Sequence, residues 1–118
     1  MINRIILIGR IGKDPETFKD GQIAKLSLAT NESKKNNEGD WEDATTWHTV
    51  VAFKNQAERM AKYKKGSMIY VEGKMSYRSY EDKEGIKRIA PEVICNYART
   101  LTKEESKQVV SESDVPWA

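Results

Sequence analysis

The segment Thr46–Phe53 constrains the fold of this chain most, because its residues alternate with the period of a β-strand. One face of such a strand carries two aromatic rings, those of Trp47 and Phe53, and the opposite face carries His48. Two exposed rings would form a platform for unpaired bases, since every base has a π-face on which it can stack. The alternative is that both rings fill a core, where aromatic side chains are common. The segment therefore predicts a strand and leaves two uses for its rings open.

Strand patterns also dominate the rest of the chain. Apolar and β-branched residues recur in four further segments, separated by turn residues such as Asp20-Gly21 and Asp82–Gly85. A short strand is also expected at Thr17-Phe18, and the polar stretch Asn31–Ala44 is expected to be a loop. The five main predicted strands are Ile2–Ile11, Ile23–Thr30, Thr45–Phe53, Met68–Tyr80 and Ile86–Tyr97.

One helix is predicted between the third and fourth of these strands. Asn55 can cap it, Glu58 stands at the capping-box position, and Gly66 can end it. Ala57, Met60 and Ala61 would form its apolar stripe. Five strands with a helix in this position indicate an all-β fold, the five-stranded OB-fold barrel, whose strand face and loops bind oligonucleotides.

Charge is distributed unevenly along the chain. Residues 1–103 contain 19 Lys/Arg and 14 Asp/Glu, whereas residues 104–118 contain one lysine and four acids. A basic body with an acidic tail is typical of a domain that binds a polyanion and carries an interaction segment. We therefore expect two parts, a domain over 1–101 and a short acidic tail over 102–118.

Several classes of protein fit the sequence poorly. There is no apolar run long enough to span a membrane, and the N-terminal apolar run is too short for a signal peptide. Cys95 is the only cysteine and His48 the only histidine, so neither a disulfide nor a metal-binding cluster is expected. Phosphate-binding and catalytic motifs are missing too. We expect a cytoplasmic binding protein without enzymatic activity, metal or cofactor.

Six segments resemble the bacterial-type single-stranded DNA-binding proteins in order and spacing, over residues 1 to about 101. These segments are Met1–Gly12, Asp14–Glu16, Leu28–Ser33, Thr46–Phe53, Lys65–Gly73 and Glu92-Val93. The resemblance implies a homotetramer of OB-folds that coats single-stranded DNA, at the nucleoid, during replication, recombination and repair.

The resemblance also implies which aromatic residues stack on bases. Trp47 and Phe53 match two of the family's stacking aromatics, and Tyr80 stands where the family commonly has tryptophan. Lys34 stands where another aromatic is frequent, so Trp41 is expected to substitute for that ring. Cations near these rings would track the phosphate backbone. They are Lys34, Lys35, Lys54, Lys74, Arg78, Lys83, Lys87 and Arg88.

Two further features have roles implied by the resemblance. His48 points away from Trp47 and is expected near the contact between subunits. The tail ends in Asp114, Val115, Pro116 and Trp117, which is similar to the tip with which the family docks on replication and repair proteins. Here Ala118 follows the aromatic, so the terminal carboxylate is displaced from the ring.

The sequence is also compatible with two other functions. One is an RNA-binding or primosome-type OB-fold accessory protein, and the other is a module that binds only proteins. Replacing Trp47 and Tyr80 together by alanine distinguishes the second from nucleic-acid binding, because only a nucleic-acid binder needs both rings.

Overall fold

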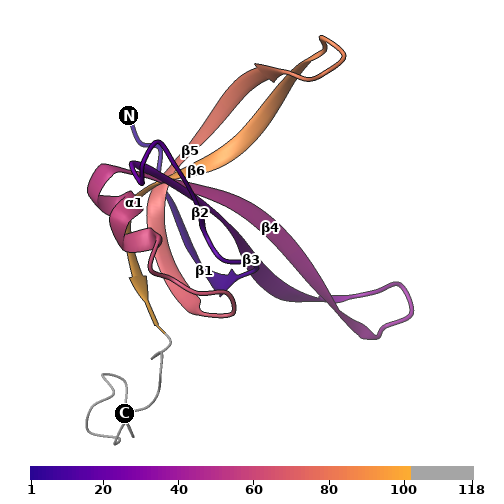
Figure 1. Cartoon of the computed structure of the whole chain (residues 1–118). Coiled ribbons are helices and arrows are strands. Elements are labelled where there is room, and N and C mark those ends of the chain that lie inside the picture. The colour runs from indigo at the N-terminus through magenta and orange to yellow at the C-terminus, as the bar shows by residue number, and fades with distance from the viewer. Residues whose placement is uncertain (102–118) are drawn as a thin grey trace, which may run out of the picture.

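Residues 1–101 are the part of the chain that the structure, a computed structural model, describes (Figure 1). They form six strands and one short helix. In chain order the elements are β1 (Ile5–Ile11), β2 (Glu16–Phe18), β3 (Ile23–Lys35), β4 (Trp41–Phe53), α1 (Lys54–Met60), β5 (Met68–Glu81) and β6 (Lys87–Thr100).

Five of the strands close into a barrel. The sheet runs β1-β5-β6-β4-β3, and β3 returns to pair with β1 at Arg10–Ala29 and Ile11–Leu28. The β4–β6 pair is parallel and the other barrel pairs are antiparallel. The short strand β2 adds to the free edge of β3. The predicted five-stranded barrel is confirmed, with the helix between its third and fourth strands.

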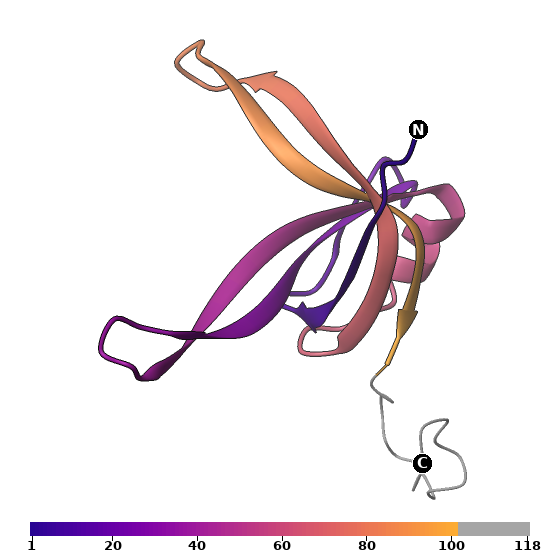
Figure 2. The ribbon, with the colours of Figure 1, turned by 180° about the vertical axis from the view of Figure 1, so that it is seen from behind.

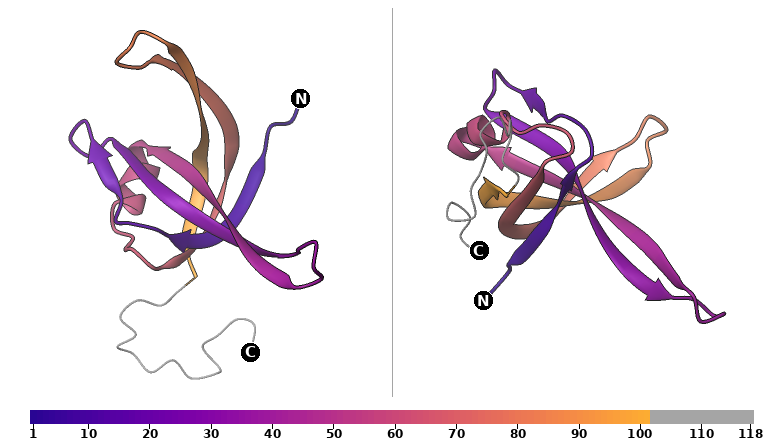
Figure 3. Two further views of the ribbon diagram at one scale, coloured as in Figure 1. Left: turned by 90° about the vertical axis from the view of Figure 1, so that its right-hand side faces the viewer. Right: turned by 90° about the horizontal axis from the view of Figure 1, so that it is seen from below.

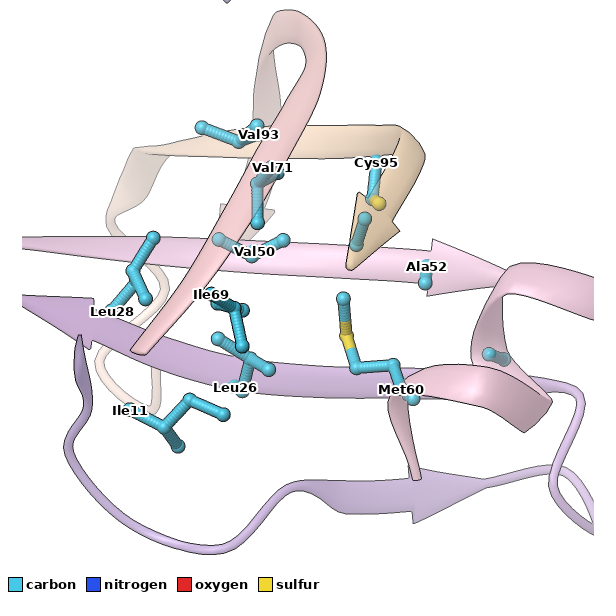
Figure 4. Packing of buried hydrophobic residues seen from close by; sticks show 13 residues of the cluster. Ile11, Leu26, Leu28, Val50, Ala52, Met60, Ile69, Val71, Val93 and Cys95 are labelled. Carbon is cyan, nitrogen blue, oxygen red and sulfur yellow. The ribbon is translucent and has the colours of Figure 1, made fainter. Parts of the chain in front are cut away.

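The barrel is filled by the inward-facing residues of the alternating strands. Leu26 and Leu28 from β3, Val50 from β4, and Ile69 and Val71 from β5 are all fully buried and point toward one another (Figure 4). The predicted alternation of Ile23–Thr30 is thus the alternation between core and outer surface. Gly73 lies at a bulge between β5 and β6, where a β-carbon would collide with the Ile94 carbonyl oxygen.

The helix α1 covers one end of this core but differs from the prediction. It buries Ala57 and Met60, while Ala61 is exposed. The expected Asn55 cap is wrong, because the helix begins at Lys54 and its N-cap, Phe53, makes no side-chain hydrogen bond. The Lys54 N–H instead donates to the Gln22 carbonyl at 2.8 Å, so the turn before β3 sets the start of the helix.

Two hairpins extend beyond the barrel as arms, one formed by β3 and β4 and the other by β5 and β6 (Figures 1 and 2). The two arms leave the barrel in different directions, as the side and bottom views also show (Figure 3). No helix among residues 1–101 is both long and apolar enough to cross a membrane.

The expected loop Asn31–Ala44 is wrong, since only residues 36–40 connect β3 to β4. Polar pairs hold the two strands of this arm together: Thr45 donates to Asn31 at 2.7 Å, and Ser33 faces Asp43. A two-stranded ribbon with solvent on both sides needs no apolar face, so hydrophobic alternation could not reveal it.

Candidate nucleic-acid interface

The outer face of β4 presents the two predicted rings to solvent. Trp47 is 60% exposed and Phe53 is 44% exposed, whereas Val50 and Ala52 on the other face belong to the core. The alternative in which both rings fill the core is therefore wrong. This arrangement follows from barrel closure, because each strand has only one inward face.

The Trp47 indole lies against Gly12, just after the end of β1. A β-carbon added to Gly12 would stand 2.8 Å from Cη2 of the ring, well inside van der Waals contact. The Gly12 N–H donates to the Ser27 carbonyl at 2.9 Å, so β3 holds this backbone in place. The missing side chain of Gly12 is thus what allows the ring to lie so close to the backbone at the end of β1.

A second exposed aromatic residue, Phe18, lies on the same face of the sheet as Phe53, and the sequence did not predict it as part of the site. Phe53 pairs with Ile23, and Ile23 pairs with Phe18 of β2, which is 46% exposed. Directly paired residues share a face of a sheet. Phe18, Ile23 and Phe53 therefore form an apolar row across three strands. The register between the strands, which the sequence does not state, is what brings them together.

On the other arm, Tyr80 of β5 is 43% exposed and is contacted by an arginine. The Arg78 guanidinium carbon lies 5.5 Å from the centroid of the Tyr80 ring. Arg78 also forms an ion pair with Glu92 of β6, with Nη2 and Oε2 3.2 Å apart. Glu92 is only 7% exposed. Tyr77, which is 67% exposed, has the opposite strand parity and faces away from Tyr80.

The tip of this arm is organised by Asp82. Its carboxylate accepts hydrogen bonds from the backbone N–H groups of Glu84 and Ile86, and from Arg88 Nε at 2.9 Å. The hydrogen bond from Arg88, followed by those from the backbone, lowers the pKa of Asp82 below its ordinary value of 3.8. Arg78 and Arg88 therefore each have a carboxylate partner within the chain.

The six predicted lysines are all exposed. Lys35 Nζ lies 5.8 Å from the centroid of the Trp41 ring, and Lys34 is opposite Glu42. In the β3–β4 arm, residues 31–45 contain two lysines and five acids. In the β5–β6 arm, residues 74–92 contain five cations and four acids. The β5–β6 arm is therefore the more favourable one for phosphate.

His48 lies on the inner parity of β4, as expected, and is half-buried. Its Nε2 shares a hydrogen bond of 2.9 Å with Thr30 Oγ1 of β3. Its expected place near a subunit contact stays a prediction.

A second apolar surface lies on the outside of β1, β5 and β6. Ile6 and Ile8 are about half exposed, and the rings of Tyr70 and Tyr97 meet edge to face at a centroid distance of 6.1 Å. Ile8, Tyr70 and Tyr97 line an open recess of about 370 Å³.

The predicted tail residues Asp114–Trp117 lie outside the described residues, and no cluster of potential metal ligands occurs within 1–101.

Known proteins share both the sequence and the fold of this chain. The model of the single-strand binding protein family matches residues 2–101. The chain is 36% identical over 104 residues to the single-stranded DNA-binding protein of Neisseria meningitidis, and 36% identical over 110 residues to single-stranded DNA-binding protein 1 of Chlorobaculum tepidum. These matches cover 85% and 89% of this chain, but only 60% and 68% of the relatives.

Solved structures agree with this result. A Plasmodium falciparum SSB in complex with single-stranded DNA superposes with a TM-score of 0.75 at 30% identity, covering 86% of this chain and 97% of that one. A deletion variant of the single-stranded DNA-binding protein from Thermus aquaticus superposes with a TM-score of 0.71 at 27% identity, covering 87% and 52%.

Proposed function

The chain belongs to the single-strand binding protein family, and from this premise we propose that residues 1–101 bind single-stranded DNA without sequence preference. The observation that carries the proposal is the exposure of Trp47 and Phe53 on one face of β4, with Tyr80 on the neighbouring arm. Large apolar rings left in solvent beside cations suit the faces of unpaired bases. The protein's role is accordingly binding rather than catalysis.

Affinity has two separable sources in this proposal. Each stacked base contributes about 1–3 kcal/mol. Each phosphate neutralised by an exposed lysine, such as Lys74, Lys83 or Lys87, steepens the log–log dependence of affinity on salt by about 0.7.

The proposal is tested by titrating the protein with oligo-dT at several salt concentrations, following tryptophan fluorescence. Replacing Trp47 and Tyr80 together by alanine is expected to weaken binding by at least about thirtyfold, since two stacking contacts are lost. Tyr77→Ala is the matched control, because it removes an exposed ring from the opposite face of the same arm. An unchanged affinity of the double variant would refute stacking on these rings.

A competition between oligo-dT and oligo-U of equal length tests the choice of nucleic acid. We expect oligo-dT to win, because the solved neighbour from Plasmodium falciparum holds single-stranded DNA. Preference for oligo-U would favour an RNA-binding accessory protein, and failure to bind either oligomer would favour a module that binds only proteins.

We also propose that the chain assembles into a homotetramer through the outer face of β1. This strand pairs with β5 over Ile5–Arg10, but with β3 only at Arg10 and Ile11. Within residues 1–101, most of one edge of β1 is thus unpaired and can accept another strand, and the apolar face of Ile6, Ile8, Tyr70 and Tyr97 lies beside it.

Sedimentation velocity of Ile8→Asp tests this assembly. We expect a smaller species, because a carboxylate would be buried in an apolar contact. Ile89→Asp places the same charge at an exposed position on the β5–β6 arm and should sediment as the parent does. A monomeric parent protein would refute the assembly.

We propose that 102–118 recruits replication and repair proteins through Asp114–Trp117, and that the protein acts in replication, recombination and repair at the nucleoid. Trp117→Ala should abolish capture of such partners while leaving oligo-dT affinity unchanged. Equal capture by both forms would contradict it.

A further inference from the structure

The foot of the β5–β6 arm contains a buried carboxylate that DNA binding does not obviously require. Glu92 is 7% exposed, and its two oxygens receive hydrogen bonds of 3.2 to 3.4 Å from Arg78 Nε and Nη2. Glu92 pairs in register with Ser76, so Arg78 reaches it diagonally across the two strands. One end of the Arg78 guanidinium is thereby anchored on β6.

The same guanidinium lies beside the Tyr80 ring, 5.5 Å from its centroid. Tyr80 pairs in register with Arg88, which Asp82 holds at 2.9 Å. Tyr80 therefore has one arginine beside its ring and a second arginine opposite it on β6, and each arginine is paired with a carboxylate. An aromatic ring attracts a cation that lies near its face. A ring that is already held in place loses less conformational freedom when it stacks on a base.

We propose that Glu92 and Arg78 are positioning residues for Tyr80, and that Arg78 is not one of the cations that neutralise phosphate. This inference rests on the proposed binding of single-stranded DNA and revises the role expected of Arg78 from the sequence. If Arg78 turned to a phosphate, Glu92 would keep a buried charge without its partner, which is strongly unfavourable. Lys74 has the same strand parity, is exposed, and has no ion pair within residues 1–101, so it is free to bind phosphate.

The substitution Glu92→Gln gives a test in which the two roles predict opposite signs. It removes one negative charge from the arm and replaces the ion pair with Arg78 by a weaker neutral hydrogen bond. If charge alone mattered, oligo-dT would bind more tightly. We expect binding to weaken about three- to tenfold, because a loosened ring loses part of a stacking contact. Unchanged or tighter binding overturns the proposal.

Two further variants separate positioning from simple loss of structure. In a Tyr80→Ala background, Glu92→Gln should no longer weaken binding and should tighten it, since only the charge effect remains. The double variant Arg78→Gln/Glu92→Gln keeps the net charge, and its salt slope should equal that of the parent. Lys74→Gln, by contrast, should flatten the slope by about 0.7. A flattened slope in the double variant identifies Arg78 as a phosphate contact and overturns the proposal.

A readout without DNA distinguishes failure of the positioning role from failure of the proposed function. The NMR signals of the Tyr80 ring, assigned with Tyr80→Phe, should shift in free Glu92→Gln protein. Thermal unfolding of each variant confirms that it is folded, and the double variant, with no unpaired charge, serves if Glu92→Gln does not fold. Failure of the parent protein to bind oligo-dT refutes the proposed function, whereas unmoved Tyr80 signals refute the positioning role.

Discussion

Substituting Gly12 by alanine should move the Trp47 ring without deleting it. The backbone of Gly12 is not in the left-handed region, so alanine adds no strain there. The three atoms nearest to its β-carbon would all belong to the Trp47 ring. The substitution therefore acts on the orientation of one candidate stacking residue.

The geometry sets the size of the effect. The new β-carbon would collide with Cζ3 of the ring and lie 2.8 Å from Cη2, whereas carbon atoms pack best at about 3.5–4.0 Å, so the ring must move by at least about 1 Å. If the shift removes about half of a stacking contact, affinity falls about two- to tenfold. Stability should change by less than about 1 kcal/mol, since alanine also restricts the unfolded chain.

Three measurements check this reasoning. Fluorescence titration with oligo-dT gives the affinity, near-ultraviolet circular dichroism reports the displaced indole, and urea unfolding gives the stability. In a Trp47→Ala background the Gly12→Ala change should have no further effect on binding. An unmoved indole signal, or an equal loss of affinity in that background, would refute the proposed link between Gly12 and Trp47.

Three further predictions concern stability and pH. Leu28→Ala should lower the free energy of unfolding by about 2–5 kcal/mol, because Leu28 is fully buried; a loss below about 1 kcal/mol in urea unfolding would contradict the core assignment. Burial raises the pKa of the Cys95 thiol above its ordinary value of 9.0, so the stability it contributes is complete below about pH 9 and declines above it. Cys95→Ala should remove this decline in the free energy of unfolding, measured in urea between pH 8 and 10. An identical decline in the variant would contradict the assignment to Cys95. The lowered pKa of Asp82 means that its stabilisation of the arm is present above pH 3.8 and is lost only as pH falls through the lower value in the folded state. NMR titration of the Glu84 and Ile86 amides should thus have a midpoint below 3.8, and a midpoint at or above that value would disagree.

The sequence predicted best where one face of a strand is buried. Ala24, Leu26 and Leu28 alternate with polar residues, and all three lie in the core. It predicted poorly where neither face is buried, as in Asn31–Ala44, since a solvated ribbon leaves no apolar pattern. The helix start was missed for a related reason, because a tertiary hydrogen bond from Lys54 to Gln22 replaces the expected local cap.

By itself, the sequence determined the main strands and the one helix between them, because period-two alternation and turn residues are local properties of the chain. It also determined that Trp47 and Phe53 share a face. Only the tertiary structure decided that this face points outward, since closure of β1 onto β3 leaves each strand a single interior side. It likewise decided that Arg78 and Arg88 have partners, because an ion pair depends on which strands lie side by side and in what register.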